Sequence, residues 1–167
     1  VIGHEMTHGF DDQGCNFDKD GNLNNWWTES DKKNFDERAT VLSNYFDSIT
    51  VAPGVKANGR LTLGENIADQ GGLKVAMAAF KKATQDNPLT VKEGFTPEQR
   101  FYISYAGVWA GNIRPEEILV LTKSDPHSLA RWRVNGALPQ LDHWYETFNI
   151  TEQSPLFVAK EKRASVW

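Results

Sequence analysis

With 167 residues, of which 40% are hydrophobic and 24% charged, the chain is long enough to build the core of one domain. Its formal net charge is −4 and it has no basic block, which argues against nucleic acid as a partner, because phosphate binding needs clustered Lys and Arg. No apolar run approaches the length of a membrane span, and the single cysteine, Cys15, cannot form an internal disulfide.

The first half of the chain predicts two helices separated by a loop. Residues 1 to about 9 have the pattern of the last turns of a helix, and residues 10–27, rich in Asp, Asn and Gly, predict a long loop. Thr28 is a typical N-cap with Asp31 three residues later, and apolar residues then recur at helical spacing. Residues 50–60 predict a second loop.

The second half predicts further helices and no strand of convincing length. The stretch TLGE at residues 62–65 resembles a capping box and predicts a helix to about Thr84. Thr96 followed by Pro97 predicts another helix start, with an end near Gly111. Two more prolines indicate two further short helices, Pro115 and Pro139.

The most informative motif is HEMTH at residues 4–8, which fits the pattern H-E-x-x-H. Residues four apart lie on one face of a helix, so His4 and His8 can direct two imidazoles at one metal ion, with Glu5 beside it. A catalytic zinc ion takes three protein ligands and leaves one position open for water. The motif fixes only three positions, so a chance occurrence on a surface helix is the alternative at this point.

A candidate third ligand lies downstream, in the sequence ENIAD. Glu65 and Asp69 are also four apart, so one helical face carries two carboxylates. Glu65 can complete a site of two histidines and one glutamate, and Asp69 can accept the free N–H of a ligand histidine. The alternatives are a plain capping-box glutamate and a solvated acid.

The combination of H-E-x-x-H with E-N-x-A-D further on resembles the neprilysin and endothelin-converting-enzyme family of zinc metallopeptidases, including its bacterial oligoendopeptidase O-like members. The other matching stretches are VIGHEMTHGFDDQG, WW, LGENIADQGG, RPEE, SDPHS and the terminal SVW. The resemblance implies a mainly α fold, the C-terminal helical part of a thermolysin-like (zincin) catalytic domain. It also implies that residues 1–167 are an N-terminally truncated fragment of that domain.

The resemblance implies a role for each matching residue. His4, His8 and Glu65 match the ligands of one zinc ion per chain, and Glu5 matches the general base. Asp69 matches the catalytic-site carboxylate that supports a ligand histidine.

Residues around this centre match supporting roles. His127 matches the histidine that stabilises the oxyanion, with Asp125 orienting it, and Asp11 matches another supporting carboxylate. Arg133 matches an arginine that holds a substrate backbone carbonyl. Three residues match walls of the apolar pocket for the residue after the scissile bond: Val1, Val108 and Trp109.

The resemblance also implies a substrate and partners. The expected activity is hydrolysis of oligopeptides on the amino side of hydrophobic residues, and the expected partners are the peptide and the missing N-terminal part of the same chain. A fragment without that part is expected to be inactive and to associate as a homo-oligomer through exposed apolar surface. Ala164 stands where animal members have a cysteine, which points to a bacterial protein of the envelope, periplasm or medium, with the cytoplasm as the alternative.

Two other interpretations compete with the peptidase. One is a non-catalytic helical interaction domain that keeps the motif as scaffold. The other is a calcium loop at residues 16–27, where Asp18, Asp20 and Gly21 fit an EF-hand but Trp27 replaces the bidentate Glu. We therefore interpret residues 16–27 as a turn-rich loop.

Overall fold

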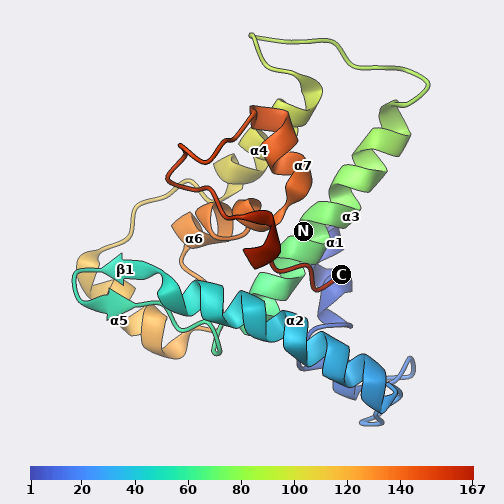
Figure 1. The fold of residues 1–167 in the computed structure, drawn as a ribbon, viewed down its shortest axis with the longest axis vertical. Coiled ribbons are helices and arrows are strands. Elements are labelled where there is room, and N and C mark those ends of the chain that lie inside the picture. The colour runs from blue at the N-terminus through green and yellow to red at the C-terminus, as the bar shows by residue number, and fades with distance from the viewer.

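The computed structural model describes all 167 residues and is mainly helical (Figure 1). Its helices and strands are α1 (Ile2–His8), α2 (Glu29–Ser48), β1 (Thr50–Ala52), β2 (Val55–Lys56), α3 (Leu63–Thr84), α4 (Pro97–Val108), α5 (Pro115–Ser124), α6 (Ala130–Asn135) and α7 (Asp142–Phe148). Three short 3-10 turns lie at Gly14–Asn16, Leu138–Gln140 and Lys160–Lys162. None of the helices is long and apolar enough to span a membrane.

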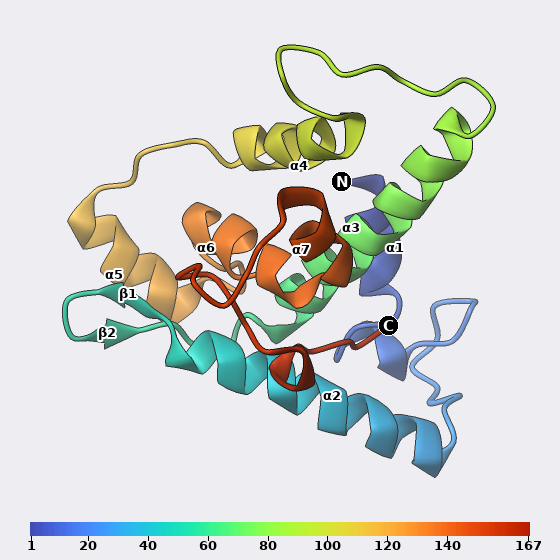
Figure 2. The ribbon, with the colours of Figure 1, turned by 45° about the horizontal axis from the view of Figure 1, so that its top comes forward.

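The long helix α3 runs from the middle of the molecule to its edge, with α1 along one side and α2 crossing near its N-terminal half (Figures 1 and 2). The first hydrophobic cluster joins α2 to this half of α3 and includes Phe46, Leu63 and Ile67. The second cluster joins the other half of α3 to α4 and α7, and includes Met77 and Trp144. Because α3 contributes to both clusters, its position is fixed from Leu63 to about Met77.

Helix α1 is short, and close packing against α3 holds it. A Cβ atom on Gly72 would lie 2.5 Å from the backbone nitrogen of His4, and one on Gly71 would lie 2.6 Å from a methyl carbon of Thr7. Both positions therefore need glycine, because a side chain would push the two helices apart. An isolated helix of seven residues is unstable in water, so this contact maintains the helical spacing of the H-E-x-x-H motif.

All three predicted helix starts are confirmed, but the predicted capping box is present at only two of them. Thr28 and Thr96 both form complete capping boxes, and Pro97 is the first residue of α4. Thr62 precedes α3 but makes no cap; its hydroxyl donates instead to the carbonyl of Asn58. The backbone of Thr62 is not in the extended conformation that lets a cap side chain reach the helix N–H groups.

Three other details differ from the predictions. Residues 50–60 contain a small antiparallel hairpin, β1–β2, because Gly54 adopts φ = +73° in the turn. Helix α4 ends at Val108, before Gly111. Pro139 lies in a 3-10 turn rather than at the start of an α-helix, while Pro115 does begin α5.

Candidate metal centre and its pocket

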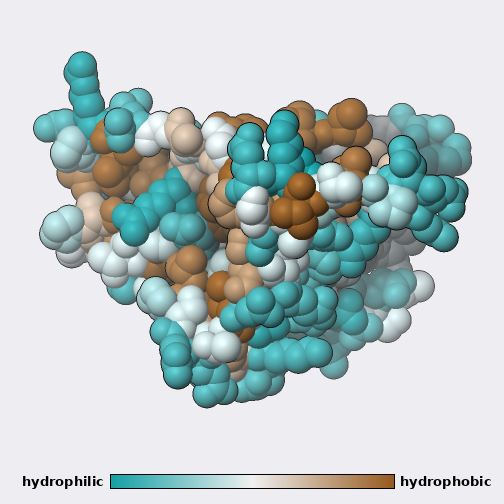
Figure 3. All heavy atoms as spheres, turned by 90° about the horizontal axis from the view of Figure 1, so that it is seen from above, coloured by the Kyte–Doolittle hydropathy of each residue, from teal (hydrophilic) through white to brown (hydrophobic).

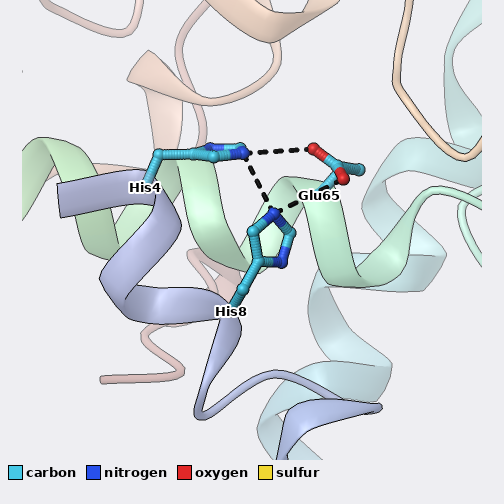
Figure 4. A group of neighbouring side chains, drawn as sticks. All are labelled: His4, His8 and Glu65. Carbon is cyan, nitrogen blue, oxygen red and sulfur yellow. Dashed lines mark hydrogen bonds and ion pairs between the residues drawn. The ribbon is translucent and has the colours of Figure 1, made fainter. Parts of the chain in front are cut away.

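Three side chains from α1 and α3 converge on one point (Figure 4). The Nε2 atoms of His4 and His8 are 3.1 Å apart, and Glu65 places one oxygen 3.2 Å from His4 Nε2 and the other 3.4 Å from His8 Nε2. Two ligand atoms, each about 2.0–2.1 Å from a tetrahedral zinc ion, lie roughly 3.3–3.4 Å apart. The spacing of the three groups therefore matches three corners of a zinc coordination tetrahedron.

Two buried carboxylates set the orientation and the tautomer of the histidines. His4 Nδ1 lies 2.9 Å from Asp69 Oδ1, and His8 Nδ1 lies 2.7 Å from Asp11 Oδ2. Each Nδ1–H donates to its carboxylate, so each Nε2 presents a lone pair to the centre. Asp11 is itself held by the backbone N–H groups of Gln13 and Gly14.

The hydrogen bonds within and around this donor set are poor. The Nε2 atoms of His4 and His8 face each other, His4 Nε2 has a long contact of 3.4 Å to Arg133 Nη2, and Glu65 Oε2 is buried without a hydrogen-bond donor. A buried acceptor in this state carries a desolvation penalty of about 1–3 kcal/mol or more. A divalent cation removes both problems, so the residues present fit zinc.

Arg133 of α6 lies beside the centre and pairs with Asp69. Its Nε donates to Asp69 Oδ2 and its Nη2 to Oδ1, each at 2.8 Å, and its guanidinium lies 4.1 Å from the ring centre of Trp109. Burial is the largest single factor and lowers the pKa of Arg133, but the hydrogen bonds to Asp69 and the negative charges of Asp69 and Glu65 together outweigh it and raise this pKa. Nη2 is also 3.5 Å from Glu65 Oε2, so the same side chain faces the metal ligands.

His127 approaches the centre from the segment after α5. Both its backbone N–H and its Nδ1 lie within 2.8 Å of Asp125 Oδ1, and the backbone N–H bond is the largest factor that lowers the pKa of Asp125. The ionised Asp125 orients the ring and leaves Nε2 free, 3.4 Å from Glu65 Oε1. The side chain of His127 is 49% exposed, so the ring remains accessible to a ligand.

A pocket of about 670 Å³ opens beside these groups. Its polar end contains His4, Glu5, His127 and Arg133, and Glu5 is exposed there. Its apolar end is lined by Val1, Leu73, Ala76, Phe80, Leu89, Phe101, Val108 and Trp109. Seen from above, the exposed hydrophobic surface forms separate areas between polar side chains rather than one continuous face (Figure 3).

The structure brings every predicted site residue to this region and adds several that the sequence did not indicate. Phe80 and Phe101 line the pocket, although their helical spacing alone gave no reason to separate them from the core. Ser128 donates to Asn66 in a buried hydrogen bond of 2.8 Å, which ties the His127 segment to α3. Tyr105 donates to the carbonyl of Arg133, and no sequence motif links these two residues.

The turn-rich loop and Cys15 lie outside this centre. Asp18 accepts hydrogen bonds from the backbone N–H groups of Asp20 and Asn22 and closes a turn, as the interpretation of residues 16–27 predicted. Cys15 is buried, and burial raises the pKa of its thiol.

An H-E-x-x-H helix packed against a second helix that supplies a glutamate and its neighbouring aspartate defines the class of zincin-like metal centres. The chain belongs to peptidase family M13, whose sequence pattern matches residues 1–164. The resemblance to the neprilysin family is therefore confirmed.

Relatives of known identity support this assignment. The chain is 39% identical to Neprilysin-11 of Caenorhabditis elegans and 38% identical to human Neprilysin, and each match covers all of this chain. It covers only 20% and 23% of those proteins, so it spans about a fifth to a quarter of the length of these relatives.

Solved structures show the same fold. The zinc metalloprotease Zmp1 of Mycobacterium tuberculosis, in complex with an inhibitor, superposes with a TM-score of 0.95 at 38% identity, over 99% of this chain and 26% of that one. PepO of Lactobacillus rhamnosis superposes with a TM-score of 0.85 at 37% identity, and the match covers 98% of this chain and 24% of that one. The mainly α architecture is thus the helical part of an M13 metalloprotease fold.

Proposed function

We propose that this chain supplies the metal centre of a zinc-dependent endopeptidase that hydrolyses oligopeptides. The observation that carries the proposal is the set of three converging donors, His4, His8 and Glu65, with both histidines already oriented by carboxylates. Membership of family M13 and the relatives described as neprilysins and zinc metalloproteases support it.

When bound at these donors, zinc would act as a Lewis acid that lowers the pKa of bound water from ~15.7 to roughly 7 and polarises a carbonyl group. Glu5 is adjacent to the donors, exposed in the pocket and not held by any ion pair, so it is free to accept the proton of the attacking water. Glu5 then returns this proton to the leaving amine. Proton transfer by such a group contributes about 10²–10⁴-fold.

Two cationic or donor groups act on the substrate. With both ring nitrogens protonated, His127 donates Nδ1–H to Asp125, which holds the ring, and directs Nε2–H toward the carbonyl oxygen of the scissile bond as negative charge forms there. Loss of one such donor costs about 10²–10³-fold in rate. Arg133 pairs with Asp69 through Nε and Nη2 and also lines the pocket, and we assign its remaining N–H groups to the backbone carbonyl of the bound peptide.

The apolar end of the pocket favours a hydrophobic side chain. It lies next to the proposed general base and is lined by Val1, Val108, Trp109 and other apolar residues. We therefore propose cleavage on the amino side of a hydrophobic residue.

The experiment that tests this function uses the full-length protein that contains this chain. Zinc is removed with a chelator and restored while hydrolysis of two quenched fluorescent peptides is followed. The peptides differ only in carrying Phe or Asp after the intended scissile bond. Zinc-dependent cleavage of the Phe peptide with at least about tenfold preference is expected. Turnover that persists without metal, or equal cleavage of both peptides, contradicts the proposal.

We also propose that the 167-residue chain alone turns over peptides poorly. The chain spans about a fifth to a quarter of the length of its relatives. Alignment of a substrate against the metal can supply ~7–11 kcal/mol of barrier lowering, which the rest of the protein would help to provide. Turnover by the chain alone within tenfold of the full-length protein contradicts this. Association of the chain with itself and its place in a bacterial envelope stay predictions, the first of which light scattering would check.

A further inference from the structure

The last four residues of the chain, 164–167, are part of the hydrophobic core next to the metal site. Ala164 and Val166 are each 1% exposed and belong to the same cluster as Leu63 and Ile67. Leu63 and Ile67 lie on either side of Glu65 in α3. We call residues 164–167 the terminal segment.

Two buried glutamines bind the backbone of the terminal segment. The side-chain amide of Gln70 donates to the carbonyl of Ala164 and accepts from the N–H of Val166, and Gln140 accepts the N–H of Ala164. Gln70 is 1% exposed and directly follows Asp69, the partner of His4. A buried amide that lost these partners would carry an unsatisfied donor and acceptor, so the bound segment helps to hold this turn of α3 in position.

Trp167 extends the contact to the residues that support His8. Its ring centre lies 5.7 Å from Phe35 of α2, 5.6 Å from Trp27 and 6.1 Å from Phe10. Phe10 immediately precedes Asp11, the carboxylate that orients His8. Phe10 is itself 46% exposed, so few other groups restrain it.

The terminal segment thus contacts α3, which supplies Glu65, through Gln70, and it contacts the loop that follows α1, which carries Asp11, through Trp167. We propose that it is a positioning element of the metal centre, in which Trp167 holds the Phe10–Asp11 loop so that His8 faces Glu65. The inference rests on the proposed function, since it assigns a role toward zinc. Trp167 acts through Phe10 and Asp11 and does not touch the metal.

The test is zinc affinity of the 167-residue chain, measured by competition with a chromophoric chelator, together with thermal unfolding with and without metal. Trp167→Ala is expected to weaken zinc binding by about tenfold, the lower end of the range for groups that orient metal ligands. Trp167→Phe should restore most of the affinity, since an aromatic ring again meets Phe10. It also keeps the test informative if Trp167→Ala does not fold.

A matched control is Phe148→Ala, which removes an aromatic ring packed on the second hydrophobic cluster. It should lower the unfolding temperature and leave zinc affinity unchanged. If Trp167→Ala lowers stability as Phe148→Ala does but keeps wild-type zinc affinity, the terminal segment is only structural and the inference is wrong. Failure of the wild-type chain to bind zinc would contradict the proposed function as well, so the two failures are distinguishable.

Discussion

The two halves of α3 differ in how fully the protein surrounds them. From Leu63 to Leu73 most residues are buried, and the fully buried polar ones include Asn66, paired with Thr62 and Ser128, and Asp69, paired with His4 and Arg133. From residue 74 to 84, buried and exposed residues alternate along the helix: Met77 is buried and Val75 is half exposed. One face of this half lines the apolar pocket.

This difference assigns a separate task to each half. Metal ligands need fixed positions, so the first half is surrounded by α1, α2 and the terminal segment, where any shift breaks several hydrogen bonds at once. A pocket wall needs only an apolar surface of suitable shape, and substitutions there are better tolerated. Changes in the first half should therefore affect metal binding, and changes in the second half should affect substrate choice.

Glu65→Ala is expected to have the largest effect. It removes the only carboxylate among the three donors and should weaken zinc binding by more than about 100-fold, beyond the range for residues that merely orient ligands. Activity of the full-length protein should be lost together with the metal. Metal analysis of the purified variant checks this, and an unchanged zinc content would show that Glu65 is not a ligand.

Glu5→Gln, in α1, separates proton transfer from metal binding. The side chain is exposed in the pocket and is not one of the converging donors, so zinc should be retained. Turnover of the full-length protein should fall by about 10²–10⁴-fold because the amide cannot accept a proton. Steady-state kinetics beside metal analysis would decide, and loss of zinc in this variant would mean that Glu5 has a structural role.

The parts of this arrangement that the sequence predicted were set by local rules. The i, i+4 spacing of His4 with His8 and the capping boxes at Thr28 and Thr96 depend on neighbours within one turn. The pairing of Arg133 with Asp69 depends on how α6 packs against α3, across a sequence separation of 64 residues. No local pattern reports such a contact, and the resemblance suggested Arg133 only as a substrate-binding residue.

The error at Thr62 has the same origin. The sequence TLGE has the residue types of a capping box, but Thr62 is buried and its hydroxyl is used by Asn58 and Asn66. Glu65 is thereby left free of the cap and turns toward the histidines. A local signal for helix capping thus gave way to the tertiary contacts of the metal site.

Gly72→Ala tests the boundary between the two halves. The added Cβ would lie 2.5 Å from the backbone nitrogen of His4 and 2.8 Å from its Cα, so α1 must move. Overpacking of this kind costs about 1–3 kcal/mol. Zinc affinity should fall roughly 5- to 160-fold if that strain is relieved on metal release. Gly107→Ala on α4, where the added carbon meets nothing within 4 Å, is the matched control. Equal zinc affinities for the two variants would show that α1 tolerates displacement.

Phe80→Leu should have the smallest effect and is confined to the second half of α3. Phe80 lines the apolar end of the pocket and its ring centre lies 5.8 Å from that of Phe101. Leucine keeps the surface apolar but leaves space, so the preference for a large side chain should weaken while the metal donors stay in place. We expect kcat/KM of the full-length protein to fall up to about tenfold for a peptide with Phe after the scissile bond. A peptide with Leu at that position should be cleaved nearly as well as before. Zinc content should not change, because no residue of this half of α3 contacts a donor of the metal centre. A loss of zinc in Phe80→Leu would mean that the two halves of α3 are coupled, and that the division between metal binding and substrate choice is wrong.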